Sequence, residues 1–311
     1  MDLETEDPDD YRSYRTVTRG DEEYHIDSYC CVQEVVNSGS LKTPFGTICH
    51  EYSHCFGLPD LYNDVASIVN KWDLMDFGNY CGNGFRPCSY SALERMLMGW
   101  LTPIELTDGA TITDMPALED NSRAYLIRND GSENEYYIIE NRQQKGWDEQ
   151  LPGSGIIVSH VDYDEDVWLT LTDWVNSRIR KRYTIFPANN QSTIYSQTGW
   201  AYPYVVTDKL GNNTVVNDSL TNTSAPAATL LNPNTDGEML MSKPVTKMEV
   251  NADGLASFVF MGGDSDTDGI HTMASSNEKH TDWYTLDGRR LATKPTTKGL
   301  YIVNGRKVIV P

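Results

Sequence analysis

The segment from residue 50 to residue 60 is the most informative part of this chain, and it reads His50-Glu51-Tyr52-Ser53-His54-Cys55-Phe56-Gly57-Leu58-Pro59-Asp60. On a helix, His50 and His54 project from one face a turn apart, where both imidazoles can reach one metal ion. Gly57 stands where a helix can end and the chain can turn back, which would bring Asp60 round as a third ligand. Three protein ligands leave a fourth position open for water, the arrangement of a catalytic rather than a structural zinc site.

Glu51 follows the first histidine and can face water on the metal as a general base. The pattern therefore predicts metal-assisted hydrolysis, with His50, His54 and Asp60 as metal ligands and Glu51 as the catalytic residue. The alternative is an ordinary amphipathic helix with two surface histidines, which has no reason to be followed by a glycine turn.

The string from His50 to Asp60 resembles the zinc signature of the metzincin peptidases, in the variant that ends in Asp rather than His. Extended through Leu61-Tyr62, it resembles the immune-inhibitor-A-type secreted bacterial metallopeptidases. The resemblance implies a zinc endopeptidase that acts on protein or peptide substrates. Metzincins also carry a methionine turn beneath the metal, and the segment 72–78 is similar to it, which makes Met75 the candidate methionine.

Many metzincins place a tyrosine two residues after this methionine, as an extra ligand or an oxyanion donor. Here that position is Phe77, so Tyr80 and Tyr90 are the candidates for the transition-state donor. The segment 89–101 then predicts a helix, which the family would have at the end of its catalytic domain. The apolar stripe of this helix consists of Leu93, Met96, Leu97 and Trp100.

The part of the chain before the motif is short for this family, whose catalytic sheet mostly precedes the zinc helix. Only 49 residues precede His50, and residues 1–23 are acidic and polar without an apolar run long enough for a core strand. Residues 24–36 predict an extended segment, which could line the substrate cleft. The chain thus resembles either the later part of a longer precursor or a degenerate copy that lost its upper sheet. We expect a signal peptide upstream and a secreted or cell-surface location.

Composition excludes some classes of partner. The sequence has 45 acidic and 25 basic residues, a formal net charge of −20, which argues against nucleic acid and anionic membranes as partners. No apolar run approaches the length of a transmembrane segment.

All six cysteines lie in the first 88 residues. Cys81 and Cys88 could form a disulfide if the protein is exported, and we expect at most one disulfide. The zinc helix should bury the face opposite the metal through Ile48, Tyr52 and Cys55, with Cys49 and Cys55 as small hydrophobic side chains.

The whole sequence predicts an α+β protein. A partial metzincin-like catalytic domain at 24–105 follows the acidic segment 1–23, and a β-rich, sandwich-like domain occupies 106–261. The clearest strands of the latter are 125–127, 136–139, 155–161, 182–186 and 256–260. A linker at 262–280 leads to a small β module at 281–311, which resembles the sorting or anchoring tails of exported Bacteroidetes proteins.

Three further groups of residues have two readings each. His160 and Asp162 share one face of a strand and could form a second metal site, although a hydrogen-bonded histidine on a sheet is favoured. Aromatic residues could line a sugar- or peptide-binding face, although a role in the core is favoured: Trp168, Trp174, Trp200, Tyr202 and Tyr204. Asp264, Asp266 and Asp268 imitate the start of a calcium loop, but Ser275 replaces the usual glutamate, so an acidic linker is favoured over Ca²⁺ binding.

Two functions follow from these readings. The first is a secreted zinc-dependent endopeptidase, and the second is an inactive peptidase remnant that serves as a surface binding or adhesion protein. The intact motif favours the first function and the missing upstream strands favour the second.

Overall fold

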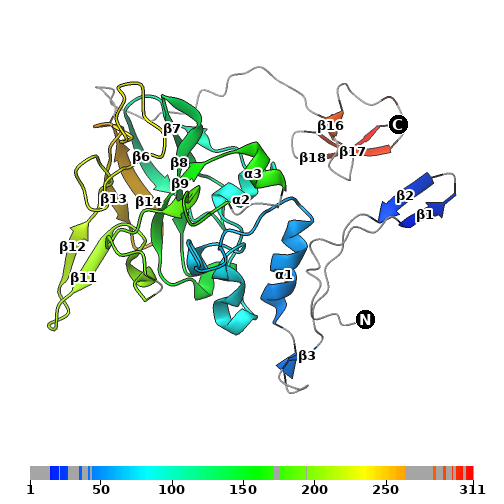
Figure 1. Ribbon diagram of the computed structural model, residues 1–311, viewed down its shortest axis with the longest axis horizontal. Coiled ribbons are helices and arrows are strands. Elements are labelled where there is room, and N and C mark those ends of the chain that lie inside the picture. Colours follow the sequence, from blue (N-terminus) through cyan, green and yellow to red (C-terminus); the bar gives the residue numbers. More distant parts are fainter. Residues whose placement is uncertain are drawn as a thin grey trace. The chain divides into compact units, whose positions relative to one another are not determined.

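The computed structural model describes residues 15–20, 22–26, 35–36, 41–42, 44–170, 175–193, 195–263, 283–284, 290–291, 296, 299–303 and 306–310. The chain divides into two compact units, residues 1–265 and residues 266–311. It is a mixed α and β protein, rich in strands, with several sheets and short helices (Figure 1). The mixed class agrees with the prediction from sequence.

Two short sheets precede the motif at residues 50–60. Strands β1 (Arg15–Arg19) and β2 (Glu22–Ile26) form an antiparallel hairpin, and β3 (Val35–Val36) pairs with β4 (Leu41–Lys42). β1 thus forms a strand within the acidic segment, but in a two-stranded sheet rather than in the core. Of the extended segment predicted at 24–36, residues 27–34 lie outside the described part of the chain.

The helices are short. They are α1 (Phe45–His54), η3 (Asn70–Trp72), η4 (Phe77–Gly84), α2 (Ala92–Leu97), η5 (Gly146–Gln150), α3 (Glu165–Thr170) and η6 (Gln197–Gly199). α2 begins with a capping box, in which Ser91 and Glu94 satisfy each other's backbone N–H groups. It ends before Gly99, which has a positive φ of 71°. Trp100 therefore lies past the helix with 56% of its surface exposed, and the predicted stripe reaching Trp100 is wrong at that residue.

The central sheet has five strands: β5 (Ile104–Glu105), β7 (Tyr125–Asn129), β8 (Ser132–Arg142), β9 (Gly155–Asp162) and β10 (Tyr183–Ile185). Their order is β10-β9-β8-β7-β5, and all neighbours are antiparallel except β5 and β7. The strands predicted at 125–127, 136–139, 155–161 and 182–186 are confirmed. β8 and β9 run through the middle of the sheet (Figure 1).

A second sheet consists of β6 (Ala110–Met115), β13 (Val245–Val250) and β14 (Ala256–Phe260), in the order β13-β14-β6. It packs on one face of the central sheet. Alternation along β8 divides its side chains between two cores. Tyr137 and Ile139 join the core shared with Phe258, whereas Tyr136 and Ile138 join a second core shared with Met75. The segment that follows the motif at residues 50–60 therefore covers the other face of the central sheet.

Two antiparallel β elements complete the chain. β11 (Tyr204–Thr207) and β12 (Asn213–Asn217) form a hairpin that extends away from the sheets (Figure 1). In the second unit, β15 (Trp283–Tyr284), β16 (Arg290–Leu291), β17 (Gly299–Val303) and β18 (Arg306–Val310) form a sheet in the order β16-β15-β17-β18. No helix among the described residues has the length and hydrophobicity needed to cross a bilayer.

Candidate metal centre

Helix α1 ends where the glycine turn was predicted. The N–H of Gly57 donates to the carbonyl of His54 at 2.9 Å, and Gly57 has a φ of +83°, a conformation that only glycine adopts at low cost. The chain then reverses so that Asp60 returns to the helix. At the other end, Gly46 lies so close to η4 that a Cβ atom would stand 1.9 Å from the carbonyl oxygen of Asn79. This close approach fixes α1 against the segment that carries the floor of the site.

The buried face of α1 differs from the one predicted. The helix buries Gly46, His50 and Ser53, whereas Ile48 and Tyr52 are 38% and 56% exposed. Cys55 is exposed as well, and Cys49 is half-buried. The prediction of a buried face opposite the metal is thus wrong for Ile48, Tyr52 and Cys55, because α1 packs against η4 on the histidine side and not on its opposite side.

His50, His54 and Asp60 meet at one point and could hold a metal ion, since one potential ligand atom from each lies within 4.8 Å of the other two. Oδ1 of Asp60 is 3.1 Å from Nε2 of His50 and 3.6 Å from Nε2 of His54. Ligand atoms about 2.0–2.1 Å from a tetrahedral metal lie about 3.3 Å apart, so these separations suit a small divalent cation. The three residues thus fit the site that the sequence predicts.

The inner nitrogens of both histidines donate to backbone carbonyls. Nδ1 of His50 lies 3.0 Å from the carbonyl oxygen of Leu74, and Nδ1 of His54 lies 2.7 Å from that of Leu58. A carbonyl oxygen can only accept, so each Nδ1 carries a proton and each Nε2 presents its lone pair to the Asp60 side. Hydrogen bonds of this kind orient metal-binding imidazoles and raise their basicity.

The electrostatics of His50 also suit a cation. Burial lowers the pKa of His50, but hydrogen bonds to Asp60 and Leu74 and the charges of Asp60 and Glu51 outweigh it, so the pKa lies above its ordinary value. A raised pKa favours a second proton on Nε2 of His50, facing Asp60, which a bound metal ion would have to displace. Glu51, half-buried on α1, is close enough for its charge to contribute.

Met75 lies beneath this group, in the turn formed by residues 74–76. Its side chain has no exposed surface and packs in the core that contains Leu58, Leu61 and Val69. Its carbonyl accepts from the N–H of Leu61 at 2.8 Å, next to Asp60. Met75 therefore packs in the core that contains Leu58 and Leu61, the residues on either side of the Pro59-Asp60 segment.

The aromatic residues near the site are arranged differently from the expectation. The ring of Tyr62 lies 6.2 Å from that of His50, Phe77 lies 6.4 Å from Tyr62, and Tyr80 lies 5.7 Å from Phe77. Tyr80, which is half-exposed, is thus linked to the ligands through two intervening rings. The sequence analysis did not identify Tyr62 as a neighbour of His50. Its position two residues after Asp60 is the sequence signal that could have identified it.

Tyr90 lies on another flank of α1. Its hydroxyl forms a 2.7 Å hydrogen bond with the hydroxyl of Ser53, and burial raises its pKa. Its ring also contacts Trp100. These contacts give Tyr90 a role in holding α1 against the segment before α2.

His160 and Asp162 do not form a second metal site. Nε2 of His160 forms a 2.7 Å hydrogen bond with Glu135, and Asp162 accepts from Arg180 and Arg182 at 2.7 and 2.6 Å. The favoured reading, a hydrogen-bonded histidine on a sheet, is confirmed. Within the described chain, only the cluster of His50, His54 and Asp60 was found with metal-binding geometry.

The Glu135 network should make stability depend on pH. Burial alone would raise the pKa of Glu135, but hydrogen bonds from His160, the N–H of Leu231 and Asn129 bring it down to about 2 from its ordinary 4.5. A lowered pKa stabilises the fold fully above pH 4.5, and this contribution is lost as the pH falls from 4.5 towards 2. We expect the difference in unfolding free energy between the wild type and Glu135→Gln to shrink by about 3 kcal/mol over that interval, measured by urea denaturation. A difference independent of pH would contradict this assignment.

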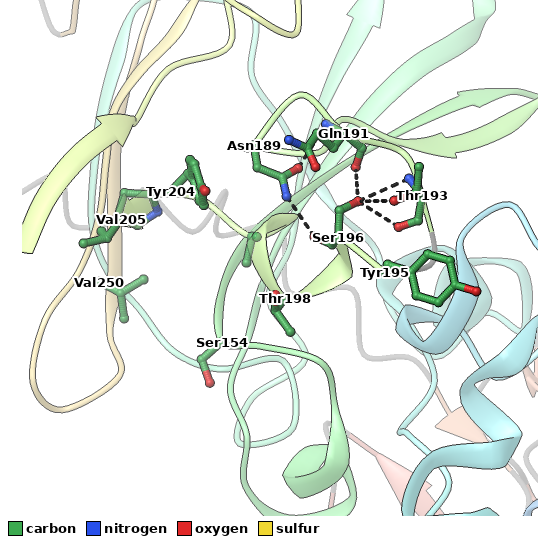
Figure 2. A pocket seen from close by; sticks show the side chains of 13 residues that line it. Ser154, Asn189, Gln191, Thr193, Tyr195, Ser196, Thr198, Tyr204, Val205 and Val250 are labelled. Carbon is green, nitrogen blue, oxygen red and sulfur yellow. Dashed lines mark hydrogen bonds between the residues drawn. The ribbon is translucent and has the colours of Figure 1, made fainter. Parts of the chain in front are cut away.

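The tryptophan and tyrosine residues considered for a binding face are mainly core residues. Trp168, Trp200 and Tyr202 are nearly fully buried, which confirms the favoured reading for these three, and Trp174 lies outside the described residues. Tyr204 lines an open, polar cavity of about 640 Å³ beside η6 (Figure 2). At the edge of this cavity, the Ser196 hydroxyl is within hydrogen-bond distance of the carbonyl oxygens of Gln191 and Thr193, to which it can donate. These contacts stabilise the local loop that carries Ser196.

The cysteines that the structure describes are free thiols. Cys81 and Cys88 are buried in one core, and burial raises the pKa of Cys81 to about 11 and that of Cys88 well above its ordinary value. The disulfide between them is therefore not formed in this structure. Cys30, Cys31 and the calcium candidates Asp264, Asp266 and Asp268 lie outside the described residues.

Comparison with known proteins adds no family assignment. A scan against models of protein families gives no match, and a search of curated proteins gives none. The geometry of His50, His54 and Asp60 therefore carries the functional argument.

Proposed function

We propose that this chain is a zinc-dependent endopeptidase of the metzincin type, in which residues 24–105 belong to the catalytic domain. The observation that carries the proposal is the convergence of His50, His54 and Asp60, with the catalytic candidate Glu51 on the same helix. Two imidazoles and one carboxylate are the donor set of several catalytic zinc sites, which keep a fourth position for water. The ligand chemistry thus favours zinc over the harder ions Mg²⁺ and Ca²⁺.

In this mechanism, each residue of the site would have a distinct role. His50, His54 and Asp60 hold the cation, and Leu74 and Leu58 orient the imidazoles through their carbonyls. When bound, zinc lowers the pKa of its water and polarises the substrate carbonyl. Glu51 takes the proton from the attacking water and delivers it to the leaving amine. Tyr80 remains the candidate donor to the developing oxyanion, since it is half-exposed beside Phe77.

The substrates would be proteins or peptides, reached outside the cell or at its surface. The net charge of −20 supports partners other than nucleic acid. The module at 281–311 would serve in sorting or anchoring, as its resemblance to exported tails implies.

Removal of the third ligand tests the metal site. We expect Asp60→Ala to weaken zinc binding by more than about 100-fold, because loss of a ligand should cost at least as much as loss of a residue that only orients one. Zinc content after dialysis and competition with a chromogenic chelator would measure this effect.

Asp64 offers a matched control, since it lies four residues further on and forms an exposed ion pair with Arg178. Asp64→Ala should bind zinc like the wild type. Equal affinity of the wild type and Asp60→Ala would remove Asp60 from the ligand set. A wild type that binds no zinc would remove the site altogether.

The second function, an inactive remnant that acts as a surface binding protein, makes a different prediction. It requires stoichiometric zinc without cleavage of casein or gelatin. The measurement of zinc and of cleavage on one preparation therefore separates the two functions.

A further inference from the structure

Asp76 is a buried carboxylate that neither the motif nor the proposed mechanism uses. It is 1% exposed and directly follows Met75. Its Oδ2 accepts three backbone N–H groups, from Ile68 at 2.8 Å, Val69 at 2.8 Å and Asn70 at 2.9 Å. Three donors on one oxygen hold the loop 68–70 tightly against the end of the turn formed by residues 74–76.

That turn contacts one ligand, His50, and the residue that follows a second ligand, Asp60. Its first carbonyl, of Leu74, accepts from Nδ1 of His50 at 3.0 Å. Its second carbonyl, of Met75, accepts from the N–H of Leu61 at 2.8 Å, and Leu61 follows the ligand Asp60 directly. One short turn therefore holds the His50 imidazole directly and the backbone next to Asp60, and Asp76 is its last residue.

The loop 68–70, which Asp76 holds, is connected to His54 through the packing of Val69 and Leu58. Val69 has no exposed surface and lies in the same core as Met75 and Leu58. The carbonyl of Leu58 accepts from Nδ1 of His54 at 2.7 Å. If the loop 68–70 shifted, the packing around Met75 and Leu58 would shift with it, and so would the direction of the His54 lone pair.

We propose that Asp76 is a positioning residue of the metal centre, which fixes the floor on which His50, His54 and Asp60 are arranged. This inference rests on the proposed metal site and names a determinant of its affinity and geometry. Asp76 itself binds neither metal nor substrate. It acts by locking the turn 74–76 to the loop 68–70.

The test compares zinc affinity and ligand geometry in Asp76→Asn. Asparagine keeps the shape of the side chain but offers a neutral, weaker acceptor to the three N–H groups. We expect zinc to bind about 10- to 100-fold more weakly than to the wild type, the range for residues that orient metal ligands. The absorption bands of the Co²⁺-loaded protein should shift as well, because they report the geometry of the ligands.

Asp162→Asn is the matched control. Asp162 is also buried, but its side chain accepts from Arg180 and Arg182, in the segment before β10, and not from the backbone N–H groups of the loop 68–70. This variant should melt at a lower temperature than the wild type and keep the zinc affinity and the Co²⁺ spectrum of the wild type. The contrast separates a local effect on the site from a general loss of stability.

The outcomes distinguish this inference from the proposed function. If the wild type binds no zinc, the metal site itself is rejected. If the wild type and Asp76→Asn bind zinc with equal affinity and have the same Co²⁺ spectrum, the role of Asp76 is rejected. Thermal unfolding without metal shows first whether the variant is folded. If Asp76→Asn does not fold, Asp76→Glu carries the same test, since the longer side chain keeps the charge but displaces the three donors. Wild-type affinity and spectrum in that folded variant would also overturn the inference.

Discussion

Replacement of Glu51 by glutamine is expected to leave one bound zinc ion and to reduce proteolysis by a factor of about 100 to 10,000. Glutamine has nearly the same shape as glutamate but cannot take a proton from water, and general base catalysis contributes on that scale. The ligands His50, His54 and Asp60 are unchanged in the variant, so metal binding should persist. Cleavage of casein and zinc content, measured on the same sample, give the two readouts.

Glu165→Gln is a suitable control, because Glu165 is an exposed glutamate in the first turn of α3. It should cleave and bind zinc like the wild type. Wild-type cleavage by Glu51→Gln would refute the proposed mechanism. Loss of zinc in that variant would instead assign Glu51 a part in metal binding.

The largest effect on stability is expected from Asp148→Ala. Asp148 forms two hydrogen bonds with Arg142, at 2.7 and 2.8 Å, and both side chains are almost completely buried. Without Asp148 the guanidinium of Arg142 remains buried with only Glu140 as its ionic partner, 3.3 Å away. The loss of one partner from a buried ion pair costs about 3–5 kcal/mol, which urea denaturation would measure.

The adjacent residue provides the comparison. Glu149 pairs with Arg86 at 2.6 Å, but both side chains are about half-exposed. Glu149→Ala should change the unfolding free energy by less than about 1 kcal/mol, because water and salt screen an exposed pair. Equal effects of the two substitutions would show that burial does not govern the strength of these pairs.

The convergence of His50, His54 and Asp60 could be predicted because the relevant rules are local. His50 and His54 need only the helical repeat to face the same way, and Gly57 needs only its freedom to adopt a positive φ to bring Asp60 back. All of this information lies within eleven consecutive residues. Four of the five strands of the central sheet, β7 to β10, could also be predicted, because they are apolar runs bounded by turn residues, whereas the two-residue strand β5 was not predicted.

Other features depend on distant parts of the chain. Whether Ile48 and Tyr52 are buried depends on what packs against the far side of α1, which helical periodicity cannot tell. The carbonyl of Leu74 meets His50 across 24 positions of sequence, and Arg142 reaches the carbonyl of Trp72 across 70. A backbone carbonyl has no signature in the sequence, so these contacts become visible only in the folded chain.

The central sheet has a consequence for attempts to divide the protein. Its strand β8 presents Tyr137 and Ile139 to the β layer and Tyr136 and Ile138 to the core beneath the metal ligands. Truncation of the chain near residue 105 would remove the apolar side chains of β8 against which Met75 and its neighbours pack. The segment that carries the candidate ligands therefore cannot be transferred alone. A graft onto another scaffold would have to include strands β7 to β9.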